Sequence, residues 1–357
     1  MSELSLRRRI ALNIARSLRR SAVEGHPLRQ LFWECTLRCN LRCLHCGSDC
    51  KQEAMTPDMP KEDFFRVLDS IAAKTDPHEV FVVVSGGEPL MRADLEECGK
   101  GIYGRGFPWG MVTNGFALTP ARYSRLLQSG LHSMTISLDG LQENHDWLRG
   151  RESSFERASR AIKMVVDSEA IAFDVVTCVN RRNLSELPAI REHLIGLGLK
   201  EWRLFSIFPQ GRAAENPFLQ LSNPEFRSML DFIRETRKEG RIKTSYGCEG
   251  FLGRYEGEVR DHFYTCQAGV TIGSVLIDGS ISACTSIRSD YHQGNIYRDD
   301  FMEVWEHRFL PYRDRAWMKS GDCADCKYWK WCEGNGMHLR GADGKLMVCH
   351  LRRIVES

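Results

Sequence analysis

A short stretch decides the fold: Val82-Val-Val-Ser-Gly-Gly-Glu-Pro89, in which consecutive valines lead directly into a glycine turn. An unbroken β-branched run favours a strand that is buried on both faces, as the strands of a parallel sheet are. Gly86, Gly87 and Pro89 then end the strand in a turn. Paired glycines also let the backbone approach a ligand closely, because no side chain stands between them.

The same alternation extends to both sides of this stretch. Short β-rich runs alternate with amphipathic helical patterns, such as the one containing Phe64, Leu68 and Ile71. Repeated strand–helix units predict a parallel sheet that is closed or partly closed. The units number fewer than the eight of a full barrel, so the expected fold is α/β, a partial (β/α)6 barrel. Its predicted strands are Leu31–Thr36, Glu79–Val84, Pro108–Thr113, Ser133–Leu138, Ile171–Cys178 and Glu201–Ile207.

Polar and glycine-containing turns follow five of these strands. In a barrel of parallel strands the active site forms at the carboxyl-terminal rim, where these turns meet. Turn residues also gather there for plain loop reasons, but five such turns on one rim indicate a site. The turns are Ser85–Pro89, Thr113-Asn114-Gly115, Ser137-Leu138-Asp139-Gly140, Asn180 and Pro209–Arg212.

The chain has 14 cysteines, which in an enzyme-sized sequence indicate metal binding more than disulfides. Cys39, Cys43 and Cys46 follow the first predicted strand, and soft thiolates favour iron–sulfur clusters, zinc or copper(I). Three close thiolates would leave one iron of a 4Fe–4S cluster free. The alternative is a zinc knuckle with Cys35, His45 or Cys50 as its fourth ligand. Outside the clusters, Cys35, Cys50, Cys98 and Cys178 are interpreted as structural thiols.

The C-x3-C-x2-C spacing, with His45 at an often aromatic position, resembles the signature of radical S-adenosylmethionine (SAM) enzymes. The resemblance implies a SAM-binding 4Fe–4S cluster on Cys39, Cys43 and Cys46, whose open iron chelates SAM and yields a 5′-deoxyadenosyl radical. It places Gly86, Gly87, Glu88 and Pro89 at the methionine amino group. The fourth-strand region also resembles the family, with Ser137 as a contact to SAM and Asp139 supporting it. Asn114 and Asn180 carry less weight, because either can cap a turn, and Arg149 can be a surface charge.

The later cysteines resemble the SPASM domain, the auxiliary-cluster extension of many radical SAM enzymes. By that resemblance Cys323, Cys326, Cys332 and Cys349 form a complete four-thiolate set. A second auxiliary site would use Cys248, Cys266 and Cys284, but Gly336 stands where the family has a further cysteine. An open iron, another ligand such as His338, or no second cluster are the alternatives, and we favour a cluster with an open or unusual corner. A structural zinc ribbon is the competing interpretation of the C-terminal spacing.

The expected organisation is a basic N-terminal helix at residues 1–30, the barrel at 31–240 and the SPASM-like domain at 241–357. In the helix, Ile10, Ile14 and Leu18 recur every four residues among arginines. We expect it to pack on the main domain rather than to bind a membrane surface or a peptide. Arg16 interrupts its apolar run, which argues against a signal peptide.

Composition adds weaker limits. A net charge of +2 and a pI of about 7.9 give no reason to expect a nucleic-acid partner. No run approaches the roughly 20 apolar residues of a membrane span. The expected location is the cytoplasm.

The resemblance to SPASM-bearing enzymes predicts oxidative modification of a residue in a ribosomally made peptide or protein. A substrate radical must lose an electron to give a closed-shell product, and an auxiliary cluster can accept it. An electron donor such as flavodoxin or ferredoxin is implied for the first cluster. Thr285, after Cys284, stands where sulfatase maturases tend to carry aspartate, which argues against that activity. A separate leader-binding domain is not expected, because about thirty residues precede the first strand. The alternatives are a radical SAM enzyme acting on a small metabolite and a non-enzymatic, zinc-stabilised binding protein.

Overall fold

The computed structural model describes residues 4–48, 50–247, 250–287 and 291–355. Its strands form one sheet in the order β10-β9-β8-β1-β2-β3-β4-β5-β6-β7. The strands are β1 (Gln30–Thr36), β2 (Phe81–Gly86), β3 (Trp109–Thr113), β4 (Leu131–Ser137), β5 (Ala172–Val179), β6 (Glu201–Ser206), β7 (Lys243–Tyr246), β8 (Ile272–Val275), β9 (Ser280–Ser282) and β10 (Gly294–Asn295).

The predicted α/β fold is confirmed, and β1 to β6 match the predicted strands within two residues at each end. All six pair in parallel, as expected. The sheet extends further than predicted, because β7 joins β6 and β8 joins β1, both in parallel. The antiparallel strands β9 and β10 complete it. Hydrogen bonding therefore continues across the boundary expected near residue 240.

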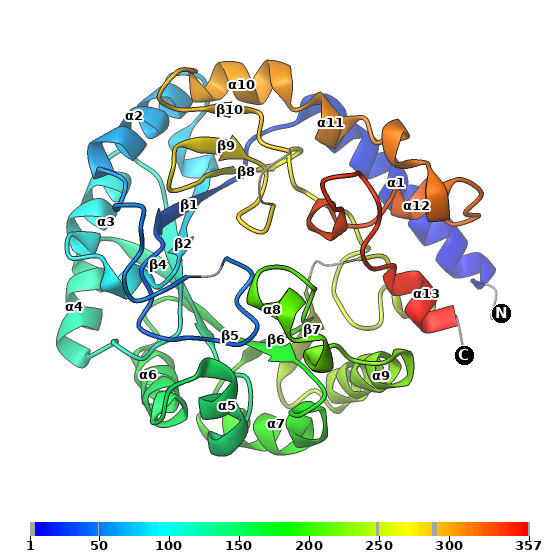
Figure 1. The fold of residues 1–357 in the computed structure, drawn as a ribbon, viewed down its shortest axis with the longest axis horizontal. Helices are drawn as coiled ribbons and strands as arrows, with labels where there is room; N and C mark the ends of the chain where they lie inside the picture. Colours follow the sequence, from blue (N-terminus) through cyan, green and yellow to red (C-terminus); the bar gives the residue numbers. More distant parts are fainter. Residues whose placement is uncertain (1–3, 49, 248–249, 288–290, 356–357) are drawn as a thin grey trace.

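Helices cover the outer, convex side of the curved sheet (Figure 1). On α2 the predicted apolar face is buried, and the Phe64 ring stacks on Trp33 of β1 at 4.3 Å. The long helix α9 begins with a capping box between Ser222 and Glu225. The helices of the barrel are α2 (Lys61–Ala72), α3 (Leu95–Tyr103), α4 (Pro120–Gln128), α5 (Gln142–Arg149), α6 (Ser154–Ser168), α7 (Leu187–Gly196), α8 (Arg212–Glu215) and α9 (Asn223–Glu239).

The C-terminal region spans the open side of the barrel from one edge to the other. Its strand β8 lies beside β1, and its last helix packs against α9 (Figure 1). The N-terminal helix α1 (Leu6–Gly25) packs against α12 of this region. None of the described helices is both long and apolar enough to cross a membrane. The C-terminal helices are α10 (Phe301–Arg308), α11 (Leu310–Arg313), α12 (Trp329–Cys332) and α13 (His350–Val355).

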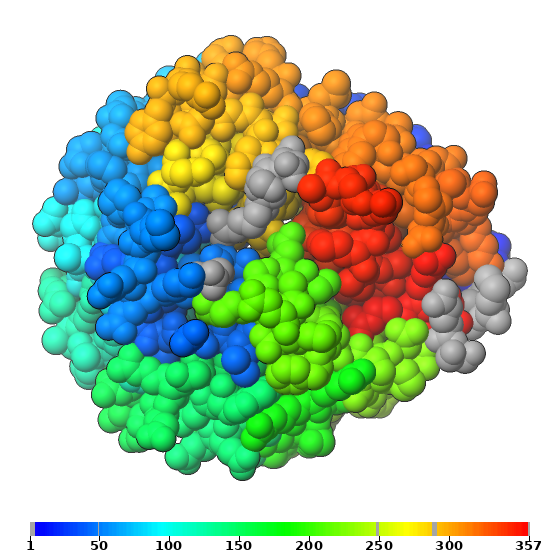
Figure 2. Space-filling view, in the orientation of Figure 1, coloured from blue at the N-terminus to red at the C-terminus, as the bar shows by residue number. Residues whose placement is uncertain are grey.

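This arrangement brings the cysteine-rich segments to one face of the molecule. Figure 2 shows the loop after β1, the segment after β6 and the C-terminal residues meeting around the centre of that face. The predicted rim and the C-terminal cysteines are thus neighbours in space.

Candidate metal centres at the barrel rim

The loop after β1 is held from two sides by the rest of the chain. The backbone N–H of Leu44 donates to the Leu148 carbonyl at the end of α5, at 2.9 Å. From α8, Arg212 donates through Nε to the Cys43 carbonyl at 2.8 Å and through Nη1 to the Cys50 carbonyl at 3.0 Å. Gly211 has a φ of +55°, and a Cβ there would stand 2.5 Å from the Cys46 carbonyl oxygen. The protein itself therefore shapes this loop.

Cys39, Cys43 and Cys46 lie close to one another in the loop. Burial raises the pKa of Cys39 to about 12, and the neighbouring charges of Cys43 and Cys46 add to the increase. Burial likewise raises the pKa of Cys43, although Arg149 opposes the rise. Several buried thiolates at one point need compensating positive charge, which an iron–sulfur cluster supplies. The three residues therefore fit a cluster.

Cys50 is the fourth cysteine of this loop. It is buried, and its thiol donates to the Ser48 carbonyl at 3.9 Å. Its closeness to Cys46 lowers the pKa of Cys46. The same contact raises the pKa of Cys50, so that thiol stays protonated. Cys35 and Cys98 are fully buried in the hydrophobic core, as expected of structural thiols.

Arg149, at the end of α5, is buried between two groups of the site. Its Nη2 forms an ion pair with Asp139 Oδ2 at 2.5 Å, and its Nη1 lies 3.6 Å from Cys43 Sγ. The structure thus excludes a surface charge at this position. The guanidinium connects a sulfur of the cysteine loop to the turn that follows β4.

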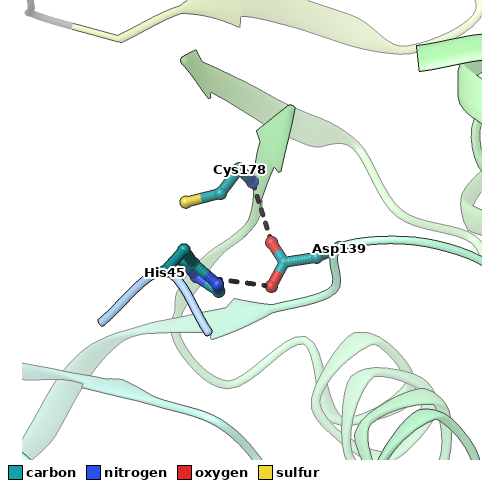
Figure 3. A group of neighbouring side chains, drawn as sticks. All are labelled: His45, Asp139 and Cys178. Carbon is teal, nitrogen blue, oxygen red and sulfur yellow. Dashed lines mark hydrogen bonds and ion pairs between the residues drawn. The ribbon is translucent and has the colours of Figure 1, made fainter. Parts of the chain in front are cut away.

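Asp139 joins this turn to β5. Its Oδ1 accepts from the backbone N–H of Cys178 at 2.8 Å, while Oδ2 lies 3.8 Å from His45 Nε2 (Figure 3). Burial opposes ionisation of Asp139, but Arg149, the two neighbouring histidines and the Cys178 N–H together outweigh it and lower the pKa. Burial lowers the pKa of His45 to about 4, so its ring is neutral.

His45, Asp139 and Cys178 also have the spacing of a small cation site. Their potential ligand atoms lie within 4.8 Å of one another. However, the guanidinium of Arg149 already contacts Asp139 Oδ2 and would repel a cation there. We therefore interpret the group as a hydrogen-bonded support of the cysteine loop. Cys178, which we expected to be structural, belongs to this support.

The glycine turn after β2 packs directly on the chain that leads to Cys39. The N–H groups of Gly87 and Glu88 donate to the carbonyls of Thr36 and Arg38 at 2.7 and 2.8 Å. A Cβ would stand 2.2 Å from the Thr36 carbonyl oxygen at Gly86 and 2.3 Å from the Arg38 carbonyl oxygen at Gly87. Both positions thus require glycine for packing, in addition to the expected approach of a ligand.

Glu88 is fully occupied inside the protein. Its Oε1 accepts from Thr113 Oγ1 at 2.6 Å and from the Leu90 N–H at 3.1 Å, and its Oε2 accepts from the Asn114 N–H at 2.7 Å. Asn114 in turn donates through Nδ2 to Asn40 Oδ1 at 2.8 Å, beside Cys39. Glu88 therefore clamps the glycine turn to the end of β3.

Three further residues of the predicted site remain. Ser137 lies half-buried at the end of β4, and its hydroxyl has no hydrogen-bond partner among the described residues. Asn180 caps its own turn, because its Oδ1 accepts from the Arg182 N–H at 2.9 Å. Pro89 is buried at the start of a short 3-10 turn.

The structure brings Cys323, Cys326, Cys332 and Cys349 together. Burial raises the pKa of Cys332 to about 12, and the charges of the other three cysteines raise it further. Arg340 Nη2 lies 3.4 Å from Cys323 Sγ. Four converging thiols with a cation beside them fit a complete cluster ligand set. Nothing in the cysteine spacing pointed to Arg340.

Cys266 and Cys284 each lie close enough to the buried Tyr312 to raise its pKa. Burial opposes ionisation of Cys266, but Arg315 and the Met337 N–H outweigh it and lower the pKa. Gly336, where the family has a cysteine, thus lies one residue from a direct contact with Cys266. The imidazole of His338 packs against the Phe208 ring, 5.1 Å between centroids. Cys248 lies outside the described residues.

Comparisons with known proteins agree with this geometry. A model of the radical SAM superfamily matches residues 33–194, and a model of SPASM, an iron–sulfur cluster-binding domain, matches residues 266–327. The AdoMet-dependent heme synthase of Methanosarcina barkeri is 29% identical, covering 88% of this chain and 93% of that protein. The mycofactocin maturase MftC of Mycolicibacterium smegmatis is 28% identical over 86% of this chain and 77% of its own.

Solved structures show the same fold. SuiB of Streptococcus suis bound to SAM has a TM-score of 0.69 at 16% identity, covering 89% of this chain and 76% of that chain. The native enzyme anSMEcpe with bound AdoMet also has a TM-score of 0.69, at 17% identity, over 92% and 94% of the two chains. The chain thus contains a radical SAM domain followed by a SPASM domain, and it is an enzyme for which these domains imply 4Fe–4S clusters and SAM as cofactors.

Proposed function

We propose that this enzyme oxidatively modifies a residue in a ribosomally made peptide or protein. When bound, the clusters and SAM supply a 5′-deoxyadenosyl radical at the first site and an electron acceptor at the second. One observation carries the proposal: a short row of contacts joins the cysteine loop after β1 to Cys266 of the auxiliary site. An oxidation needs both sites near one substrate carbon.

The row of contacts starts beside Cys46 and ends beside Cys266. A Cβ on Gly47 would stand 3.8 Å from the Phe208 ring, which packs against His338. The N–H of Met337, the residue before His338, donates to Cys266. A substrate held at Phe208 would therefore lie between the loop that generates the radical and the residues that face the auxiliary site.

Residues of the rim would hold SAM. The N–H groups of Gly87 and Glu88 are used within the protein, so this turn offers a ligand carbonyl acceptors. Acceptors suit the amino group of methionine, which donates. The unpartnered hydroxyl of Ser137 is suited to the carboxylate or ribose. Asp139 and Asn114 would support the cysteine loop through Arg149 and Asn40.

A peptide substrate is supported by the named neighbours. One relative is a maturase, and a solved structure of SuiB with its precursor peptide SuiA has a TM-score of 0.67 to this chain. That likeness concerns the fold, at 15% identity.

A second candidate is a tetrapyrrole substrate, which would make the enzyme act on a small molecule. Heme synthases from three organisms are 26–29% identical over most of their length, and an Fe-coproporphyrin III synthase is 27% identical. A cavity of about 1040 Å³ inside the barrel is of a size that holds small ligands. Arg203 and Lys200 line it, each paired with an acid of the same wall, Asp174 and Glu169.

The test is anaerobic turnover with SAM and a reductant, in separate reactions with short peptides encoded beside this gene and with iron-coproporphyrin. The proposal expects 5′-deoxyadenosine to rise with one peptide and that peptide to lose two hydrogens by mass spectrometry. The same changes with the tetrapyrrole alone would favour the second candidate. Phe208→Ala should reduce peptide modification more than the basal cleavage of SAM.

A further inference from the structure

The N-terminal helix α1 carries an apolar stripe that the fold leaves uncovered. Leu6, Ile10, Ile14 and Leu18 are 74%, 53%, 58% and 68% exposed. A four-residue spacing places them along one side of the helix, over about 18 Å. Such a continuous row of large aliphatic side chains differs from the scattered apolar residues of an ordinary surface.

The opposite side of α1 fixes the helix to the C-terminal region. Leu12 is buried, and Arg19 forms an ion pair with Glu333 at 2.7 Å. Asn13 Oδ1 accepts from Trp331 Nε1 at 2.9 Å. The helix was expected to pack on the main domain; it packs on the C-terminal region, through the face with Leu12 and Arg19. The stripe is therefore presented on a rigid support.

The helix α1 is rich in arginine and poor in acidic residues. Among residues 6–25 there are six arginines and one acid, Glu24. Arg8 and Arg19 are paired with acids of the C-terminal region. In the described part of the chain, no acidic side chain forms an ion pair with Arg7, Arg16 or Arg20. Arg7, Arg9 and Arg20 are exposed. Arg9 and Arg20 lie along one edge of the stripe and Arg7 lies within it, so the outer side of α1 is both apolar and cationic.

We propose that α1 binds the surface of an anionic phospholipid bilayer, with Leu6, Ile10, Ile14 and Leu18 among the acyl chains and the arginines on the phosphates. Interfacial helices combine these features: an apolar face, basic residues and a length of about 20 residues or more. Charge complementarity favours lipid phosphates, which lie on both sides of such a helix. A convex helix also suits a deformable surface, since it offers no groove to a folded partner.

The experiment is flotation of the full-length, reconstituted enzyme with vesicles of phosphatidylcholine mixed with phosphatidylglycerol, and with vesicles of phosphatidylcholine alone. We expect binding to the anionic vesicles to exceed binding to the neutral ones, and to weaken as salt is added. The variant Ile10→Ser with Ile14→Ser should reduce the bound fraction at least about tenfold. The matched control is Leu310→Ser, which removes a leucine that is 66% exposed on α11 and should bind as the wild type does.

Three results would overturn the proposal. The first is that the enzyme binds neither kind of vesicle at the same protein concentration. Equal loss in the Leu310→Ser control is the second, because it would make binding nonspecific. The third is a dimer that Ile10→Ser with Ile14→Ser dissociates without any vesicle binding, since the stripe would then join two copies. Thermal unfolding and iron content of each variant verify that the folds are intact.

Discussion

Two cysteine groups of this enzyme differ in how many ligands they offer to an iron–sulfur cluster. At the barrel rim, three cysteines lie on one loop of eight residues, and the chain holds that loop by its backbone from α5 and α8. In the C-terminal region, four cysteines converge from separate turns. An arginine lies beside a sulfur in each group, Arg149 at Cys43 and Arg340 at Cys323. This difference fits a first group that leaves one iron of a 4Fe–4S cluster free and a second group that supplies all four ligands.

The largest expected effect separates the two groups by function. Cys43→Ala should lose the SAM-binding cluster, so 5′-deoxyadenosine formation falls to background. Cys326→Ala should keep that reaction and lose the modified product, because a four-thiolate set would be broken. Chromatographic assay of 5′-deoxyadenosine and of product checks both variants. An equal loss of 5′-deoxyadenosine formation in Cys43→Ala and Cys326→Ala would contradict different functions for the two cysteine groups.

Removal of Arg149 should destabilise the first group. Arg149→Gln leaves Asp139 buried without its partner, which should lower the free energy of unfolding by about 3–5 kcal/mol. Arg149→Lys keeps a positive charge and should lower the free energy of unfolding by less. The pKa of Asp139 is lowered in the folded protein, so its contribution is present near neutral pH and lost as the pH falls through that value. The difference in unfolding free energy between wild type and Arg149→Gln should therefore become smaller in acid. Denaturant unfolding at neutral and acid pH measures it, and a gap independent of pH would contradict the role of the ion pair.

The glycine turn should show a packing effect of intermediate size. Gly87→Ala places a Cβ 2.3 Å from the Arg38 carbonyl oxygen, and the forced shift should cost about 3 kcal/mol. Gly196→Ala in α7 is the matched control, because no atom lies within 4 Å of its added Cβ; it should be neutral or stabilising by up to about 1 kcal/mol. Thermal unfolding compares the two variants, and similar melting temperatures would refute this packing.

The smallest expected effect tests the zinc alternative for the first group. Cys50→Ser keeps a hydrogen-bond donor where the thiol donates to the Ser48 carbonyl, so stability should change by less than about 1 kcal/mol and iron content should not change. A zinc site that used Cys50 as fourth ligand would instead lose its metal. Elemental analysis after anaerobic purification distinguishes the two results.

Local patterns predicted the barrel well. Short β-rich runs and the turns that follow them located β1 to β6, since each is set by residues adjacent in sequence. The strands β7 and β8 were missed, because they are only four residues long and β8 pairs with a strand more than two hundred residues earlier. A local sequence pattern cannot predict the pairing of strands that lie so far apart in the chain.

The site was predicted by residue type but not by arrangement. Cysteine spacing located both groups, whereas the burial of Arg149 depends on α5 returning its end to the cysteine loop. Glu88 was expected at the cofactor, and the structure uses its carboxylate as an internal clamp. For α1 the four-residue period was real, yet periodicity does not state which side of a helix meets the protein.

The most direct test asks whether iron at Cys39, Cys43 and Cys46 has a corner that SAM occupies. The measurement is electron–nuclear double resonance of the reduced enzyme with SAM labelled isotopically in its amino group. We expect a hyperfine coupling between the label and a cluster in the wild type, and its absence in Cys43→Ala. A wild-type enzyme with full iron content and no such coupling would contradict the account.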